Sequence, residues 1–201
     1  MVIISGPSGS GKGTVVKEIF DISDKFAYSI SATSRQPREG EIDGKDYYFV
    51  SREEFEDMIA KGEMLEHNYY CGNYYGSPKE HVYKELERGR NVILEIDVNG
   101  GMQIKSKYPE DTVLIMLVPP DADTLEKRLR SRGTETDEVI AKRIERAREE
   151  LLFTDKYDYV VVNRDGTIRE CAQSIIDIIN VVQEYSASRN AEMIKDFFEK
   201  R

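Results

Sequence analysis

Short apolar runs alternate with longer amphipathic segments along the chain. Residues 2–5 (VIIS) form a β-branched run, and residues 91–97 (NVILEID) and 111–118 (DTVLIMLV) are almost continuously apolar. Runs of this kind are typical of buried strands, and the two longer ones of central parallel strands covered on both faces. Further strand patterns occur at residues 26–30, 45–50, 63–70 and 157–163.

Helix signals lie between these runs. Ser51 and Glu54 form a capping box at the start of one helix. A second helix start is indicated by Ser77 as cap, with Pro78 in the first helical position and Glu80 closing the box. Further helices are expected after residue 14, over 121–133 and 136–153, from near residue 167, and after the segment 186–190.

The alternation of strands and helices predicts an α/β fold with a central parallel sheet and right-handed crossovers. Residues of roughly 33–80 break this rhythm, because they are rich in tyrosine and hold short strands that lie close together in sequence. We interpret them as an inserted lobe of mixed α/β structure.

Composition narrows the class of protein. The chain has 201 residues, of which 39% are apolar and 33% charged, as in an ordinary globular domain. A net charge of −9 argues against general binding to nucleic acid. The sequence holds no membrane-length apolar run, and its apolar start is too short for a signal peptide, so we expect a cytoplasmic protein without a membrane partner.

The two cysteines, Cys71 and Cys171, lie far apart and form no CxxC motif. They indicate a reducing compartment, and we interpret both as packing residues. With His67 and His81 as the only histidines, the case for a structural metal site is weak, and no metal ligands are predicted.

The stretch GPSGSGKGT follows the first strand pattern and precedes a helix, which is the context of a phosphate-binding loop. Its glycines allow several backbone N–H groups to face one anion, and the helix N-terminus adds positive potential. Gly13 stands where the general motif has Ser or Thr, so Mg²⁺ would be held through phosphate oxygens and waters. The residues expected to bind a nucleoside triphosphate are Gly6, Pro7, Ser8, Gly9, Ser10, Gly11, Lys12, Gly13 and Thr14.

Two arginines and two tyrosines could hold a second phosphate. Arg35 and Arg38 lie on a polar loop, and guanidinium groups bind phosphate bidentately while phenol hydroxyls add directional hydrogen bonds, as from Tyr47 and Tyr75. The alternatives are solvated surface charge for the arginines and packing within the lobe for the tyrosines. Arg128, Arg132 and Arg143 lie on two arginine-rich helices, for which a solvated face is again the alternative.

Five stretches, at these spacings and in this order, make the chain similar to guanylate kinases over about residues 1–165. They are GPSGSGKGT, SATSRQPREGEIDGKDYYFVS, GNYYGS, LEIDVNG and RLRSRGTETDE. The resemblance implies that Arg35, Arg38, Tyr47 and Tyr75 bind the GMP phosphate. It also places Ser31, Glu66 and Ser77 around the guanine and Asp97 near the nucleoside, and it assigns Lys12, Arg128, Arg132 and Arg143 to catalysis.

The implied fold is a three-layer P-loop fold with a GMP-binding lobe and a helical lid. We expect the core to comprise residues 1–32, 82–124 and 152–201, the lobe 33–81 and the lid 125–151. Asp97 follows a buried strand at the carboxyl edge of the sheet, where such folds bind ligands. It could equally cap the helix that starts near Asn99.

Guanine recognition by Glu66 is chemically reasonable. Guanine presents two neighbouring donors, N1–H and the N2 amino group, and an ionised carboxylate accepts both. Adenine has an acceptor at N1 and would leave the carboxylate unmatched. An exposed carboxylate at a strand end is the alternative for Glu66.

The expected reaction is phosphoryl transfer from ATP, with Mg²⁺, to GMP and dGMP, by a monomer or small homo-oligomer in purine metabolism. Such a transfer needs alignment and positive charge more than covalent help, and the GMP phosphate is already an anionic nucleophile. Two rivals remain: a non-catalytic guanylate-kinase-like module that binds peptides, and a P-loop kinase for another phosphorylated metabolite. Residues 186–201 carry an apolar stripe of unassigned role, Met193, Ile194, Phe197 and Phe198.

Overall fold

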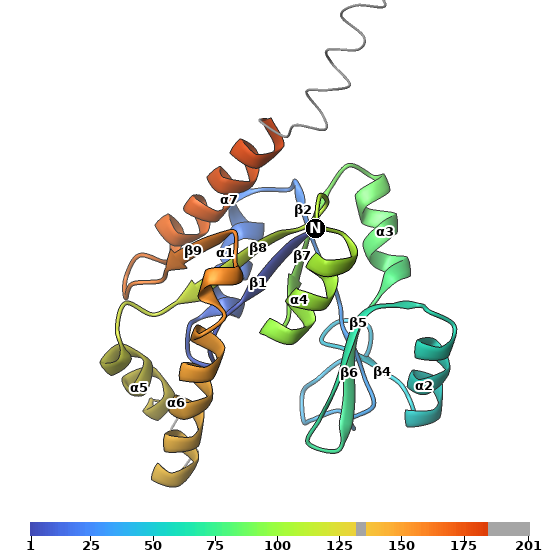
Figure 1. The fold of residues 1–201 in the computed structure, drawn as a ribbon, viewed down its shortest axis with the longest axis horizontal. Coiled ribbons are helices and arrows are strands. Elements are labelled where there is room, and N and C mark those ends of the chain that lie inside the picture. The colour runs from blue at the N-terminus through green and yellow to red at the C-terminus, as the bar shows by residue number, and fades with distance from the viewer. Residues whose placement is uncertain (132–135, 185–201) are drawn as a thin grey trace, which may run out of the picture.

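The computed structural model describes residues 1–131 and 136–184. A central sheet of parallel strands has the order β2-β7-β1-β8-β9 (Figure 1). Its strands are β1 (Val2–Ser5), β2 (Phe26–Tyr28), β7 (Asn91–Glu95), β8 (Val113–Val118) and β9 (Tyr159–Val162). The predicted α/β fold class is confirmed, and the three nearly continuous apolar runs are the three inner strands.

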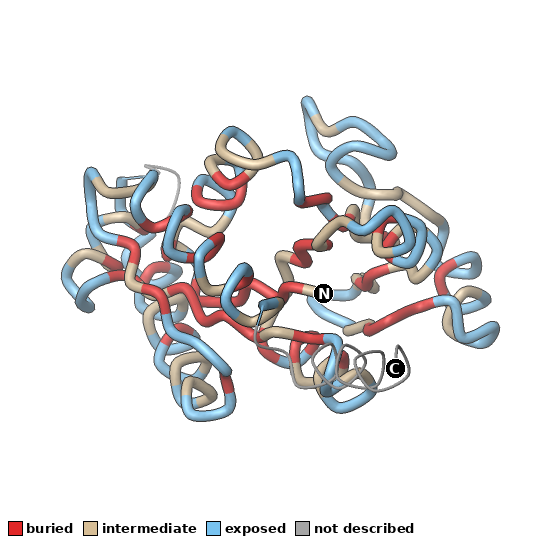
Figure 2. Tube along the Cα trace, turned by 90° about the horizontal axis from the view of Figure 1, so that it is seen from above, coloured by how far each residue is buried: buried red, intermediate tan, exposed pale blue. Residues whose placement is uncertain are grey.

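Helices cover both faces of this sheet. One face packs against α1 (Lys12–Ile22) and α7 (Ile168–Glu184), and the other against α3 (Lys79–Glu87) and α4 (Val98–Lys107). Side chains of a strand alternate between faces, so Val2 and Ile4 join the first core while Ile3 joins the second. Buried positions accordingly gather along the sheet, between exposed outer helix faces (Figure 2).

A second, mixed sheet has the order β4-β3-β6-β5. Its elements are β3 (Ala32–Thr33), β4 (Tyr48–Phe49), β5 (Met64–Tyr70) and β6 (Asn73–Pro78), with α2 (Arg52–Ala60) packed on it through Phe55. The strands β5 and β6 form a hairpin, and Cys71 (φ 49°) and Gly72 (φ 83°) make its two-residue turn. The sequence patterns predicted β5 but neither β3 nor β6.

The strand expected over residues 45–50 shrinks to β4. Asp side chains take up backbone N–H groups on its approach: Asp46 Oδ2 accepts from the N–H of Ile42 and Asp43 Oδ1 from that of Phe49, each at 2.8 Å. Such local bonds compete with a strand ladder.

Two helices with a small core of their own form the third region. Leu125 and Leu129 of α5 (Ala122–Arg130) pack against Ile140 and Ala147 of α6 (Asp137–Leu151). A short 3-10 turn (Thr154–Lys156) leads from α6 back to β9. Arg132 and the segment 186–201 lie outside the described residues, as does the expected last helix.

Polar side chains of α4 hold the backbone of β5. Gln103 donates through Nε2 to the carbonyl oxygen of His67 (3.1 Å) and accepts the His67 N–H at Oε1 (3.4 Å). Lys107 Nζ donates to the carbonyl oxygen of Leu65 (2.9 Å). The central sheet and the second sheet are thus joined through one helix.

The two cysteines differ in environment. Cys171 is buried in the core, as predicted, whereas Cys71 is exposed in the hairpin turn, so its interpretation as a packing residue is wrong. Across residues 1–131 and 136–184 the helices are all too short or too polar to cross a membrane.

Candidate active site

The glycine loop bends tightly between β1 and α1. Gly11 caps α1 with φ 88°, and a Cβ on it would lie 2.4 Å from the side-chain nitrogen of Asn163. A Cβ on Gly6 would lie 2.1 Å from the carbonyl oxygen of Leu117. Both positions therefore require glycine, because the backbone approaches its neighbours too closely for any side chain.

A cavity of about 740 Å³ opens over this loop. Lys12 lines it, and its Nζ donates to the carbonyl oxygens of Gly6 (2.6 Å) and Pro7 (3.3 Å). Most of the residues predicted for ATP also line the cavity: Gly6, Ser8, Gly9, Gly11, Lys12, Gly13 and Thr14. Ser10 and Pro7 are buried beneath them, so they shape the loop from behind.

The predicted lid arginines separate into two positions. Arg143 of α6 lines the cavity, and its Nη1 donates to the Ser8 hydroxyl at 3.3 Å. Arg128 of α5 lies behind the loop, where it binds Asp165 Oδ1 (2.6 Å from Nη2) and the carbonyl oxygen of Asn163 (2.9 Å). Longer contacts join Arg128 to loop carbonyl oxygens. The structure thus brings Lys12 and Arg143 together but not Arg128.

A second cavity, of about 320 Å³, lies between the two sheets. Five of the residues predicted for GMP line it: Ser31, Tyr47, Glu66, Tyr75 and Asp97. Ser77 is buried directly behind Glu66, and its hydroxyl donates to Glu66 Oε1 at 2.8 Å. The prediction that Ser77 caps a helix is wrong, because its hydroxyl binds Glu66 instead. The helix α3 starts after Pro78 without a side-chain cap.

Glu66 is a buried carboxylate, 4% exposed, so the alternative of an exposed strand-end acid is wrong. Burial raises the pKa of Glu66 to about 7, and the Ser77 hydrogen bond opposes that shift without cancelling it. A carboxyl in this state is poised for a ligand that donates hydrogen bonds. A ligand that stabilises the ionised form of Glu66 lowers its free energy most, because burial disfavours that form.

Arg35 is held beside this second cavity by Glu41, a residue that the sequence patterns did not single out. Two parallel bonds join them, Nη1 to Oε2 at 2.8 Å and Nη2 to Oε1 at 3.0 Å. The Arg35 guanidinium also stacks on Tyr47, 5.3 Å from the ring centroid. Hydrogen bonds from Arg35, and then from the Arg38 backbone, lower the pKa of Glu41 to about 2. The Arg38 side chain is exposed on the same loop.

Asp97 caps α4, which is one of the two roles expected for it. Its Oδ1 accepts the Gly100 N–H at 2.9 Å as the cap of α4, and its Oδ2 accepts from the Asn68 side chain at 3.1 Å. It also lines both cavities. Glu95 lies two residues earlier at the end of β7, and burial raises the pKa of its carboxyl.

The two cavities adjoin, since they share five lining residues: Tyr70, Glu95, Ile96, Asp97 and Arg146. Glu95, Tyr70 and Arg146 were not predicted. For Arg146 a signal existed, because it stands three residues after Arg143 and shares its helix face. The position of Glu95 at the carboxyl end of a buried strand was a second such signal.

Comparisons with known proteins agree with this geometry. The family model described as Guanylate kinase matches residues 1–180. A guanylate kinase of Streptococcus thermophilus (strain CNRZ 1066) is 57% identical over 164 residues, covering 81% of this chain and 78% of that protein. One of Streptococcus pyogenes serotype M3 is 50% identical over 197 residues, covering 97% and 93%.

A solved structure extends the similarity to three dimensions. The crystal structure of guanylate kinase from Anaplasma phagocytophilum superimposes with a TM-score of 0.72 at 32% identity, covering 91% of this chain and 85% of that one.

Proposed function

The chain belongs to the guanylate kinase family, and we propose that its two adjoining cavities transfer the γ-phosphoryl group of ATP to GMP and to dGMP. The observation that carries the proposal is the buried Glu66–Ser77 pair. Glu66 of this pair lines the smaller cavity, which we call the acceptor cavity, next to the phosphate loop. A carboxylate accepts both the N1–H and the N2 amino donors of guanine. Adenine offers an acceptor at N1, so it leaves a buried polar group unmatched.

The reaction needs no general base from the protein. An oxygen of the GMP phosphate attacks the γ-phosphorus of ATP, and the bond from that phosphorus to the β,γ-bridging oxygen breaks. GDP and ADP result, and the electron pair of the broken bond stays on ADP. The nucleophile is already an anion, so alignment and charge stabilisation are the main tasks of the protein.

The proposed roles follow from position. Loop N–H groups and Lys12 bind the ATP phosphates, and Arg143 neutralises charge from the lid. Arg35, Arg38, Tyr47 and Tyr75 bind the GMP phosphate, and closure of the lid excludes water that would hydrolyse ATP. Arg128 supports the loop from behind. Arg132 lies outside the described residues, and its catalytic role in the lid stays a prediction.

Mg²⁺ bound with ATP suits the groups that line the larger cavity. A Cβ on Gly13 would lie 3.7 Å from Glu95 Oε2, so a carboxylate stands close to the position where the general motif has a hydroxyl. Thr14, Glu95 and Asp97 line this cavity and can accept hydrogen bonds from waters of the ion. When bound, the ion neutralises charge on the phosphate oxygens.

A non-catalytic binding module is not favoured. Such a module has no need of a glycine loop with Lys12, or of a buried Glu66 beside it. A kinase for another metabolite is also disfavoured, because the Glu66–Ser77 pair matches guanine. We further propose a cytoplasmic monomer or small homo-oligomer in purine metabolism, with core (1–32, 82–124, 152–201), lobe (33–81) and lid (125–151) as outlined above.

A coupled assay of ADP formation tests the proposal. Purified protein with ATP and Mg²⁺ is offered GMP, dGMP, AMP, CMP and UMP in separate reactions. Turnover with the two guanine nucleotides, and at least about 100-fold less with AMP, is expected. Equal turnover with AMP, or none with GMP, would refute the specificity or the activity respectively.

A further inference from the structure

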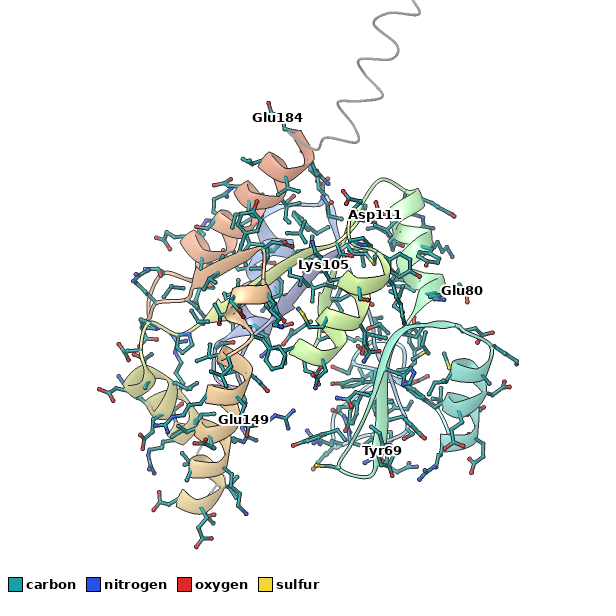
Figure 3. All side chains as sticks on the ribbon, viewed as in Figure 1. Tyr69, Glu80, Lys105, Asp111, Glu149 and Glu184 are labelled. Atoms are coloured by element: carbon teal, nitrogen blue, oxygen red, sulfur yellow. The ribbon has the colours of Figure 1, made fainter. Side chains whose placement is uncertain are left out.

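Three hollows of the molecule meet at one contact between the lid and the hairpin. The hollows are the larger cavity over the phosphate loop, the acceptor cavity and a third groove of about 500 Å³. All three are lined by Tyr70, Asp97 and Arg146. Figure 3 marks the two sides of this region by Glu149 on α6 and Tyr69 on the hairpin. The contact therefore lies at the boundary between the two substrate cavities.

The contact is a cation–π interaction between Arg146 and Tyr70. The Arg146 guanidinium carbon lies 4.5 Å from the centroid of the Tyr70 ring, and its Nε donates to Glu150 Oε1 at 3.1 Å. A guanidinium stacked on a ring uses its face, while its N–H donors point outward in the plane of the group. Its side chain is 44% exposed, so these donors are accessible from the hollows.

Charge gives the contact a function. Among the described residues that line the acceptor cavity, Arg146 is the single cation, against the carboxylates of Glu66, Glu95 and Asp97. An anionic nucleotide entering this cavity meets repulsion that one well-placed guanidinium can offset. Phosphate is also the group that guanidinium binds best, through two parallel hydrogen bonds.

Arg146 complements Arg143 along the path of transfer. The two lie three residues apart, on one face of α6. Arg143 contacts Ser8 of the phosphate loop, whereas Arg146 lies at the junction with the acceptor cavity. Together they provide positive charge at both ends of the reaction.

We propose that Arg146 binds the phosphoryl group as it passes from ATP to GMP, and that Tyr70 is the positioning residue that holds its guanidinium at the junction. The inference rests on the proposed function. It assigns Arg146 more than a structural role, because a strut between lid and hairpin would need contact with Tyr70 but none with substrate.

Steady-state kinetics of matched variants test the proposal. Arg146→Met is expected to lower kcat about 10- to 100-fold, the scale for removal of one transition-state donor, and Arg146→Lys to recover part of the loss. Arg148→Met is the control, since Arg148 lies two residues further on α6, is 74% exposed and pairs only weakly with Glu145 (3.5 Å). Tyr70→Leu removes the ring that holds Arg146, so it is expected to lower kcat and to add little to the loss in Arg146→Met.

A ligand with guanosine and adenosine joined by five phosphates provides a second readout. If Arg146 contacts the group in transit, Arg146→Met weakens binding of this tethered ligand about 10-fold or more, and binding of GMP or ATP alone much less. Equal losses for all three ligands, or kinetics like those of Arg148→Met, overturn the proposal in favour of a strut. A wild-type protein that fails to phosphorylate GMP refutes the proposed function itself, and this inference falls with it.

Discussion

The hydroxyl of Ser77 and the carboxylate of Glu66 form a hydrogen bond of 2.8 Å in the wall of the acceptor cavity, with both side chains buried. The two residues face each other across the paired strands β5 and β6. The hairpin thereby fixes the orientation of the carboxylate before any base arrives. Preorganisation of this kind favours discrimination, because the site cannot rearrange cheaply around a wrong base.

Glu66→Gln should impair recognition of guanine. The amide replaces one acceptor oxygen by a donor, which faces a guanine donor without forming a bond. We expect KM for GMP to rise about 100-fold, with a smaller change in KM for ATP. Glu63→Gln, an exposed position of the same segment, is the control and should match the wild type. An unchanged KM for GMP in Glu66→Gln would remove Glu66 from the base site.

Recognition should depend on pH near neutrality. The pKa of Glu66 is raised to about 7, chiefly by burial, so the free protein ionises this group near neutral pH. Guanine requires the ionised form, and KM for GMP should therefore fall as pH rises from about 6 to about 8. Rate profiles of wild type and Glu66→Gln measure this. A fall of the same size in the variant would assign the dependence to another group.

The stability of the folded protein should decrease as the pH rises, whereas GMP recognition improves. The folded protein keeps a proton on Glu66 between the usual pKa of 4.5 and about 7, whereas the unfolded chain releases it. The Glu66 contribution to the unfolding free energy therefore decreases as pH rises through that window. Urea unfolding at several pH values measures the unfolding free energy of the wild type and of Glu66→Gln. The wild-type value minus the variant value should decrease toward pH 8. A difference independent of pH would contradict the raised pKa.

Arg35→Ala should act on GMP and spare ATP. It removes a guanidinium held against Glu41 and Tyr47 beside the acceptor cavity. We expect KM for GMP to rise at least about 10-fold and ATP binding to stay near wild type. Arg38→Ala should move in the same direction.

Arg52→Ala is the matched control for Arg35→Ala. Arg52 belongs to the same lobe, pairs with Glu56 at 3.0 Å and stacks on Tyr69, which lines neither cavity. Arg35 instead stacks on Tyr47, which lines the acceptor cavity. If Arg52→Ala raised KM for GMP as much as Arg35→Ala, the effect would reflect damage to the lobe and not loss of a phosphate ligand.

Arg128→Met should loosen the phosphate loop. Arg128 joins α5 to Asp165 and to backbone carbonyl oxygens of Gly9, Ser10 and Asn163. Its loss should weaken ATP binding, about 10-fold, and lower the melting temperature, while Asp165→Asn gives a smaller change that is not additive with it. Arg130→Met, with its exposed pair to Glu126, should do neither. Intact ATP binding in Arg128→Met, with kcat alone reduced, would favour the predicted catalytic role.

The parts of the fold that follow from local pattern could be predicted from the sequence. The three inner strands are continuous apolar runs, and the spacing of glycines and Lys12 identifies the phosphate loop. The two-residue strand β3 and the strand β6, with its Gly76 and Pro78, have no such pattern. The hairpin turn at Cys71 pairs β6 with β5, and β3 forms by pairing with β6 and β4. Propensity is a weak guide where pairing decides.

The candidate site could likewise be predicted from the sequence only in part. Ser77 carries a valid capping pattern, but its partner Glu66, eleven residues earlier, takes the hydroxyl. Arg128 has helical spacing to Arg132, yet Asp165, which lies 37 residues away, determines where its guanidinium points. Glu41 looks like an ordinary surface charge in the sequence, and its bonds to Arg35, six residues earlier, distinguish it. Arg146 has only its spacing to Arg143 as a signal, and its contact with Tyr70, distant in the chain, distinguishes it.

The joint between α4 and β5 carries an evolutionary consequence. Gln103 and Lys107 bind backbone atoms of Leu65 and His67, and a backbone offers the same atoms whatever side chains it bears. Substitutions along the hairpin can therefore alter which nucleotide base is accepted without weakening the attachment of the hairpin to the catalytic core.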